Sequence, residues 1–291
     1  MAKIIPHLWF DDKALEAADF YTQVFPNSRK LEGATLHDTP SGTVNIANIE
    51  LMGLAFQMIN AGPYFQPNPA ISFMVHCTTP AQVDELWAKL IEGGQALMPL
   101  DSYPFSERFG WLNDRYGFSW QLILTPEIAP SISPTLMFVG GKAGSAEEAI
   151  ETYSKLFPPA KVESIERYQE HEEPDRPGTV KHARFTLSGQ RFTAMDSAHA
   201  HQFDFNEAVS LMVHCSDQSE IDRYWNALSA VPEAEQCGWL KDTFGVSWQI
   251  VPAALDTMMT EGDGEAIARV TQAFLKMKKF DLDTLEKAYR G

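Results

Sequence analysis

The sequence GWLNDRYGFSWQL, residues 110–122, returns with few changes as GWLKDTFGVSWQI, residues 238–250. The two copies share only an aspartate, a serine and a glutamine as candidates for catalysis. A reaction centre needs a nucleophile, a base or metal ligands, and two equivalent centres would carry them in both copies. The repetition therefore indicates a structural element common to both halves of the chain.

This element has the sequence pattern of a β-hairpin. Residues 114–117 predict the turn, with Gly117 where a positive φ is needed. Strand alternation then separates the two faces of the second strand. The apolar face, which we expect to pack on helices, carries Phe118, Trp120 and Leu122. The mixed face, which we expect to line a cavity, carries Ser119, Gln121 and Ile123.

Four other pairs of segments recur in the same order, so the chain is a duplicated domain. ISFMVHC (residues 71–77) and VSLMVHC (residues 209–215) are identical at five of seven positions. A proline-rich joint follows the first copy. The predicted domains are residues 1–126 and 131–253, with a helical tail over residues 254–291 that packs on its own chain or on a partner subunit.

Each copy alternates strands with helices. In the first copy, helical spacing predicts helices over residues 14–25 and 81–91. Apolar runs predict strands between them, over residues 4–10, 44–51, 54–59 and 71–77, before the closing hairpin. A copy thus holds two β-α-β-type modules, and the fold class is α+β with mixed or antiparallel sheets.

The acidic composition excludes several classes of partner. The 291 residues include 23 lysines and arginines against 39 aspartates and glutamates, for a net charge of −16. Such a chain repels nucleic acid and other polyphosphates. No apolar run approaches the roughly 18 residues of a membrane-spanning helix, and the three cysteines form no CxxC pair. We expect a reduced, cytoplasmic protein without nucleic-acid or membrane partners.

Three segments carry a resemblance to a known family: LWFDDKALEAADFYTQVFPNS near the start, and CGWLKDTFGVSWQIVP and AFLKMKKFDLDTLEKAYRG near the end. They resemble the 3-demethylubiquinone-9 3-methyltransferase-like, or PhnB-like, group of the vicinal oxygen chelate superfamily, which includes glyoxalases and extradiol dioxygenases. The resemblance implies two tandem domains, each of paired βαβββ modules that form a cupped mixed sheet around a cavity.

The resemblance also indicates where a metal would bind. In metal-using relatives, ligands come from the first and last strands of each module. These positions hold His7, Gln57, Ala70 and Gln121 in the first copy, and Thr135, Thr193, Ala208 and Gln249 in the second. Gln57, Gln121 and Gln249 stand where relatives carry glutamate. Divalent cations prefer imidazole, thiolate and carboxylate ligands, so we expect no resident metal or other cofactor, with His7 as the one weak candidate ligand.

We therefore predict a ligand-binding cup in at least one copy. Apolar pockets with a few amides and hydroxyls orient small molecules. The candidates for the first cup are Trp9, Gln57, Trp111, Ser119 and Gln121. The candidates for the second are Met137, His182, Trp239, Ser247 and Gln249.

Two other features have competing interpretations. Lys181, His182 and Arg184 form a basic patch that the first copy lacks. The patch either holds an anionic ligand in the second cup or lies on a solvated strand balanced by nearby acids. His76 and His214 each precede a cysteine, but adjacent strand residues point to opposite faces, which favours structural roles over a histidine-cysteine catalytic pair.

Three functions remain open from the sequence. The first is a protein that binds a small molecule without reaction, as a monomer with an internal pseudo-dimer or as a homodimer. The second is an enzyme, either metal-dependent through His7 or the methyltransferase of the family label, although no motif for a methyl donor is visible. The third is a structural duplication whose function is its partner surface.

Overall fold

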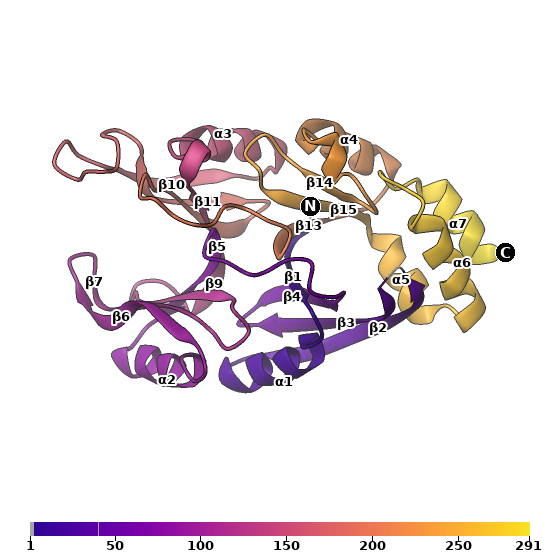
Figure 1. Ribbon diagram of the computed structural model, residues 1–291, viewed down its shortest axis with the longest axis horizontal. Coiled ribbons are helices and arrows are strands. Elements are labelled where there is room, and N and C mark those ends of the chain that lie inside the picture. The colour runs from indigo at the N-terminus through magenta and orange to yellow at the C-terminus, as the bar shows by residue number, and fades with distance from the viewer. Residues whose placement is uncertain (1–2, 40) are drawn as a thin grey trace.

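The computed structural model of the protein describes residues 3–39 and 41–291, with the side chain of Asp38 excepted. The chain folds into two mixed β-sheets flanked by helices, with a helical tail at one end (Figure 1). In the described residues, no helix has the length and apolar character needed to cross a membrane.

The first copy supplies two modules of the predicted kind. The first module comprises β1 (Lys3–Phe10), α1 (Ala14–Val24), β2 (Arg29–Thr39), β3 (Gly42–Leu51) and β4 (Leu54–Asn60). The second comprises β5 (Ile71–Cys77), α2 (Pro80–Leu90), β6 (Gln95–Tyr103), β7 (Ser106–Asn113) and β8 (Ser119–Leu124). A turn over residues 114–118, with Gly117 at a φ of 88°, closes the last hairpin as predicted.

The second copy repeats this plan with one strand fewer. Its first module comprises β9 (Ser131–Phe138), α3 (Ala146–Leu156), β10 (Lys161–Arg167), β11 (Val180–Leu187) and β12 (Gln190–Asp196). Its second comprises β13 (Val209–Cys215), α4 (Gln218–Leu228), β14 (Trp239–Lys241) and β15 (Ser247–Pro252). The position of β6 is taken by a short 3-10 helix, Pro232–Ala234.

The two sheets do not follow the two copies. Sheet A has the order β14-β15-β13-β1-β4-β3-β2, and sheet B has the order β10-β11-β12-β9-β5-β8-β7-β6. The copies meet at the centre of each sheet, where β1 pairs antiparallel with β13 and β5 pairs antiparallel with β9. Each sheet therefore combines half of one copy with half of the other.

Helices α1 to α4 cover one face of the sheets, two along each side of the molecule (Figure 1). Helix α1 buries Ala14, Ala17, Tyr21 and Val24, at the spacing of one helical face. The largest fully buried side chains include Trp120 and Trp248, on the hairpin face that was predicted to pack on helices. We call the opposite face of each sheet its cup.

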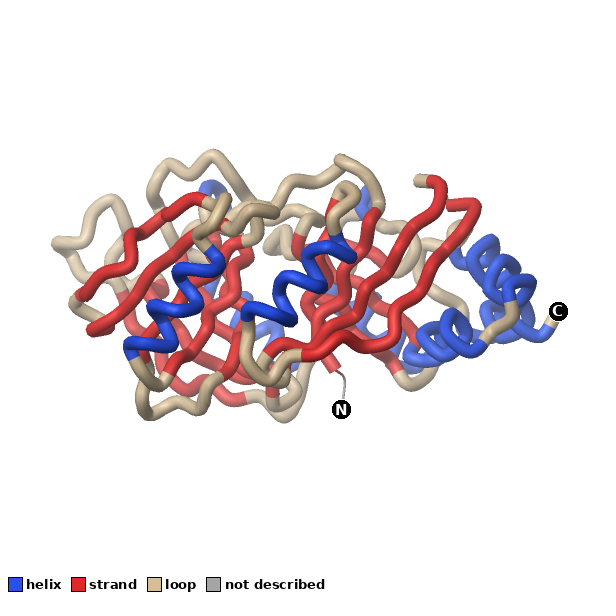
Figure 2. Tube along the Cα trace, turned by 90° about the horizontal axis from the view of Figure 1, so that it is seen from below, coloured by secondary structure: helices blue, strands red, loops and turns tan. Residues whose placement is uncertain are grey.

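The tail packs on its own chain, which was one of the two predicted alternatives. It consists of α5 (Ala253–Glu261), α6 (Gly264–Phe274) and α7 (Leu282–Arg290), gathered beyond one end of sheet A (Figure 2). Asp281 caps α7, because its carboxylate accepts from the Thr284 amide at 2.8 Å. The tail and the cup of sheet A share an apolar cluster formed by Ile5, Ala55, Met212, Val251, Leu255, Met258, Val270, Phe280 and Leu285.

Candidate functional site

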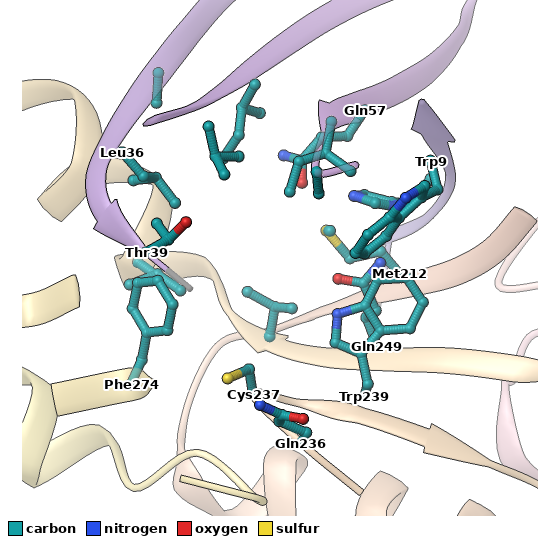
Figure 3. A pocket seen from close by; sticks show the side chains of 18 of the residues that line it. Trp9, Leu36, Thr39, Gln57, Met212, Gln236, Cys237, Trp239, Gln249 and Phe274 are labelled. Atoms are coloured by element: carbon teal, nitrogen blue, oxygen red, sulfur yellow. The ribbon is translucent and has the colours of Figure 1, made fainter. Parts of the chain in front are cut away.

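A cavity of about 470 Å³ lies in the cup of sheet A. Strands β1, β4, β13 and β15 form its floor, β2 and β3 one wall, and the tail the opposite closure. Figure 3 shows its lining, with Trp9, Met212, Trp239 and Gln249 on one side and Leu36, Thr39 and Phe274 across from them. We call this the sheet A cavity.

Three polar side chains lie together on the cavity floor. His7 on β1 is the register neighbour of Gln57 on β4, and both line the cavity. Gln249 on β15 lies across β13, and its amide donates to the Ser210 hydroxyl at 2.9 Å. The Gln57 side chain makes no hydrogen bond to any described residue, so its amide is available to a ligand.

Aromatic side chains form the wall beside this floor. The indole N–H of Trp9 donates to the Gly62 carbonyl at 2.7 Å, which fixes the ring. The ring centroids of Trp9 lie 5.0 Å from Phe65 and 6.1 Å from Trp239. Trp239 in turn packs edge to face on the His7 ring, with the ring centroids 5.3 Å apart. Such rings offer a rigid apolar surface to a planar ligand.

Burial keeps His7 neutral. Its side chain is only 2% exposed, and burial lowers its pKa from 6.5 to about 3. Its Nδ1 atom has no hydrogen-bond partner among the described residues. A buried polar atom without a partner is costly, and because Nδ1 is itself fully buried, a ligand in the cavity reaches the His7 ring but not this nitrogen.

The charges around the cavity disfavour an anion. Its described lining contains no lysine or arginine but includes the carboxylates Glu207, Glu233 and Asp256. Glu207 is 2.8 Å from Lys241, and Asp256 is 3.2 Å from His214. An anionic ligand would therefore meet acidic groups and no available cation.

The donor set does not fit the metal of metal-using relatives. The floor offers one imidazole and two neutral amides, and the described residues contain no group of three or more histidine, cysteine or acidic side chains able to hold a metal. Amide oxygens are weak ligands for zinc and similar ions. The sequence-based expectation that no metal is resident stays a prediction.

Five of the predicted site residues line this one cavity: Trp9, Gln57, Trp239, Gln249 and the weak metal candidate His7. Ser247 lies on sheet A but is not part of the lining, and it is buried. The other predicted residues, Trp111, Ser119, Gln121, Met137 and His182, lie on sheet B.

The predicted grouping of these residues by copy is therefore wrong. Trp9 and Trp111 were expected in one cup, but their strands belong to different sheets because β1 pairs with β13 of the other copy. On sheet B several predicted groups bond to one another. The Trp111 indole donates to the Ser119 hydroxyl at 2.7 Å. The Gln121 amide donates to the Ser72 hydroxyl at 2.8 Å.

The sequence did not indicate the part of the lining that comes from the tail and from the segment before β14. Phe274 and Phe280 close the cavity from the tail, and Cys237 lines it beside β14. Cys237 and Gly238 donate their backbone N–H groups to Met277 and Lys278, at 2.8 Å and 2.7 Å. The paired positive φ values of Cys237 and Gly238, 51° and 82°, make this contact possible, and the glycine was its only signal in the sequence.

The sequence profile of the family described as 3-demethylubiquinone-9 3-methyltransferase matches residues 2–123 and again residues 130–251. The chain belongs to this family. Both copies match the 3-demethylubiquinone-9 3-methyltransferase profile, as the resemblance of the sequence implied. No curated protein matched the chain.

Two solved structures are similar to this chain, and one of them spans both copies. The PhnB protein of Bacillus cereus is 39% identical over 42% of this chain and 98% of its own, with a TM-score of 0.39. Glyoxalase I of Zea mays is only 11% identical but spans 87% of this chain and 92% of its own, with a TM-score of 0.56. The architecture of this 3-demethylubiquinone-9 3-methyltransferase family member is thus the tandem vicinal oxygen chelate fold that was predicted.

Acid is expected to destabilise the folded protein through His7. In the unfolded state this side chain binds a proton below pH 6.5, whereas the folded state resists protonation until about pH 3. The contribution of neutral His7 to the unfolding free energy is fully present above pH 6.5 and is lost as the pH falls toward 3. At pH 5 the loss from this group is about 2 kcal/mol.

Urea unfolding at pH 7.5 and pH 5.0 measures this effect. His7→Gln should reduce the pH dependence of the unfolding free energy by about 2 kcal/mol. Gln23→Leu, which changes an exposed residue that does not titrate, should leave the dependence unchanged. Equal pH dependence in the wild type and His7→Gln would show that His7 is not held neutral.

Proposed function

We propose that the protein binds a small, uncharged and largely apolar molecule in the sheet A cavity. The observation that carries this proposal is a cavity of about 470 Å³ with aromatic walls and a few polar groups on its floor. Pockets of roughly 300–1,000 Å³ with this composition are typical of small-molecule sites. The same description fits no nucleic-acid surface, since the lining lacks basic residues among those described.

The polar groups give the ligand its orientation. Gln57 is available to donate and accept, and Nδ1 of His7 lacks a partner among the described residues. A hydroxyl or amide on an otherwise apolar ligand would bond to the Gln57 amide at the floor, while its ring packs against Trp9 and Trp239. The lining carboxylates and the lack of lining cations favour a neutral ligand over an anion.

Binding is proposed rather than the reaction in the family's name. The low pKa of His7, about 3, makes it a weak base at neutral pH. The lining provides no glycine-rich turn at a helix start for a nucleotide-like methyl donor within its described residues. No contact at the site favours methyl transfer over binding.

Labelling of Cys237 tests whether a ligand binds in the sheet A cavity. Cys237 lines this cavity, whereas Cys77 and Cys215 are only 2% and 0% exposed. A maleimide should therefore label Cys237 first. We expect 1-naphthol to slow this labelling in a saturable manner. 1-Naphthalenesulfonate, which has the same ring and a negative charge, should give at least about tenfold weaker protection, a difference of about 1.4 kcal/mol in binding.

Substitution of Gln57 tests whether 1-naphthol protects Cys237 by binding at the cavity floor. Gln57→Leu should weaken protection by 1-naphthol by about tenfold, since it removes one hydrogen bond from a buried polar contact. Gln23→Leu is the matched control, because Gln23 is exposed on α1. Absent protection by 1-naphthol, or equal protection by the sulfonate, would contradict the proposed ligand class.

A further inference from the structure

The cup of sheet B differs from the cup of sheet A where the tail packs. In sheet A, Ile5 and Ala55 belong to the apolar cluster shared with the tail. The repeat aligns these two positions with Ser133 and Arg191 in sheet B. The chain has a single tail, and it lies at sheet A. The corresponding part of sheet B is therefore polar and lies away from the tail.

Strand register places two arginines on the same face in this region. Arg184 on β11 pairs with Thr193 on β12, and Arg191 precedes Thr193 by two residues. Residues two apart on a strand share a face. Arg191 is exposed and Arg184 is half-buried, while the intervening residues Phe185 and Phe192 point to the core. Both guanidinium groups therefore belong to the cup of sheet B.

Among the described residues, neither arginine has a carboxylate partner. Six other arginines lie within 4 Å of an acidic side chain: Arg29, Arg108, Arg115, Arg167, Arg223 and Arg290. Among the described residues, no acidic side chain lies within 4 Å of Arg184 or Arg191, in a chain with a net charge of −16. Nε of Arg184 donates to the Ser164 hydroxyl at 3.2 Å, which leaves its terminal nitrogens for another acceptor.

Two histidines, whose pKa values burial lowers, lie near the two arginines. His182 lies two residues before Arg184 on the same strand face, and His76 lies on the central strand β5. Burial first, and then the charges of Arg191 and Arg184, lower the pKa of His76 to about 4. The acidic groups that oppose this field are Glu127 near His76 and Glu166 near His182. Neither glutamate is within 4 Å of a basic nitrogen in the described part of the chain.

The floor between these groups holds hydroxyls without partners. Ser133 and Thr135 on β9 are 1% and 0% exposed, and neither hydroxyl has a hydrogen-bond partner among the described residues. Thr135 pairs with Thr193, which pairs with Arg184, so all three share the face of the cup. These hydroxyls are fully buried below the arginines, so the guanidinium groups are the donors that an oxyanion can reach.

Sheet A shows how a carboxylate occupies the equivalent position. His214, the repeat mate of His76, lies 3.2 Å from the Asp256 carboxylate, which α5 contributes. Among the described residues, His76 has no such partner and bonds only to the Thr125 hydroxyl, at 3.1 Å. The acidic group that the tail supplies to sheet A thus has no counterpart at sheet B.

We propose that the cup of sheet B is a second binding site, which takes a small molecule bearing a carboxylate or a phosphate group. Arg184 and Arg191 bind the oxyanion, with His182 beside them as a further donor. The site is independent of the sheet A cavity and selects the opposite kind of ligand. Residues Ile46, Asn48 and Ala55, which match His182, Arg184 and Arg191 in the first copy, carry no charge.

The test uses the full chain with ¹⁵N-labelled arginine, whose Nε–H signals report on each guanidinium group. The probes are benzoate and phenyl phosphate, with benzyl alcohol as the uncharged match, at constant ionic strength set by sodium chloride. We expect saturable shifts of the Arg184 and Arg191 signals with at least one of the two anions and none with benzyl alcohol. Which anion binds more tightly distinguishes a carboxylate ligand from a phosphate ligand.

The double variant Arg184→Asn and Arg191→Ala places the first copy's own residues at both positions, so it suits the strand geometry. It should weaken the binding of the anion by at least about tenfold, because two charge-assisted contacts are lost. Arg176→Asn removes one exposed positive charge outside the strands and should not change binding. If the double variant failed to fold, the single variant Arg184→Asn would still give a partial loss.

Several results would overturn the proposal. One is the lack of saturable shifts with both anions. Another is unchanged affinity in the double variant, and a third is equal weakening by Arg176→Asn, which would indicate attraction by net charge alone. None of these results depends on the labelling of Cys237, so the proposed function of the sheet A cavity can fail or hold separately.

Discussion

Asp242→Ala is expected to lower the free energy of unfolding by about 3–5 kcal/mol, because it leaves several buried donors without an acceptor. Asp242 is 4% exposed and accepts four hydrogen bonds. The Tyr153 hydroxyl and the Trp248 indole donate at 2.6 Å and 2.8 Å. The backbone N–H groups of Phe244 and Val246 donate at 2.9 Å and 3.0 Å. One carboxylate thus joins α3 to the turn of the hairpin and to its second strand, β15.

Urea unfolding at pH 7.5 would measure this loss. Asp242→Asn, which retains one acceptor oxygen, should lose less stability than Asp242→Ala. Asp12→Ala changes an exposed aspartate and should stay within about 0.5 kcal/mol of the wild type. A loss below about 1 kcal/mol for Asp242→Ala would mean that the four donors find other partners in the folded state.

The tail residue Phe280 gives the second large effect. Phe280 is 3% exposed, lies 6.3 Å from the Phe274 ring and lines the sheet A cavity. It also fits against Gly238, where an added Cβ would lie 2.5 Å from the ring. Phe280→Ala should therefore lower the unfolding free energy by about 3–5 kcal/mol and weaken the protection of Cys237 by 1-naphthol.

The matched control is Phe105→Ala, at a position that is 59% exposed. It removes the same atoms from the surface and should change neither stability nor labelling. The two readouts also separate two roles of the tail. A stability loss without any change in Cys237 protection would show that the tail supports the fold but does not help to close the cavity.

Local chemistry made much of the fold predictable. The hairpin faces and the helix of residues 14–25 follow from side-chain periods and turn residues. The sequence predicts the aspartate shared by both hairpins only as part of a turn. Asp114 and Asp242 are instead buried acceptors for a tyrosine and a tryptophan each. The two tyrosines are 93 and 89 residues away in the sequence, so no local pattern reveals these bonds.

The partner strands could not be predicted for a similar reason. β1 pairs with β13, about two hundred residues later, and this choice decides that His7 and Gln249 share a cavity. Both copies have nearly the same strand sequences, so either pairing satisfies the alternation of apolar and polar residues. The residue types of the site were therefore predictable, but their grouping depended on long-range contacts.

The crossed sheets have a consequence for the history of the chain. A single copy of this domain could complete such sheets only by joining a second, identical molecule, and two-fold symmetry would then make both cups the same. Fusion of the copies into one polypeptide removes that constraint. A change at residue 184 alters one cup and leaves Asn48 in the other untouched. In a fused chain, the residues of one cup can therefore change while those of the other cup stay the same.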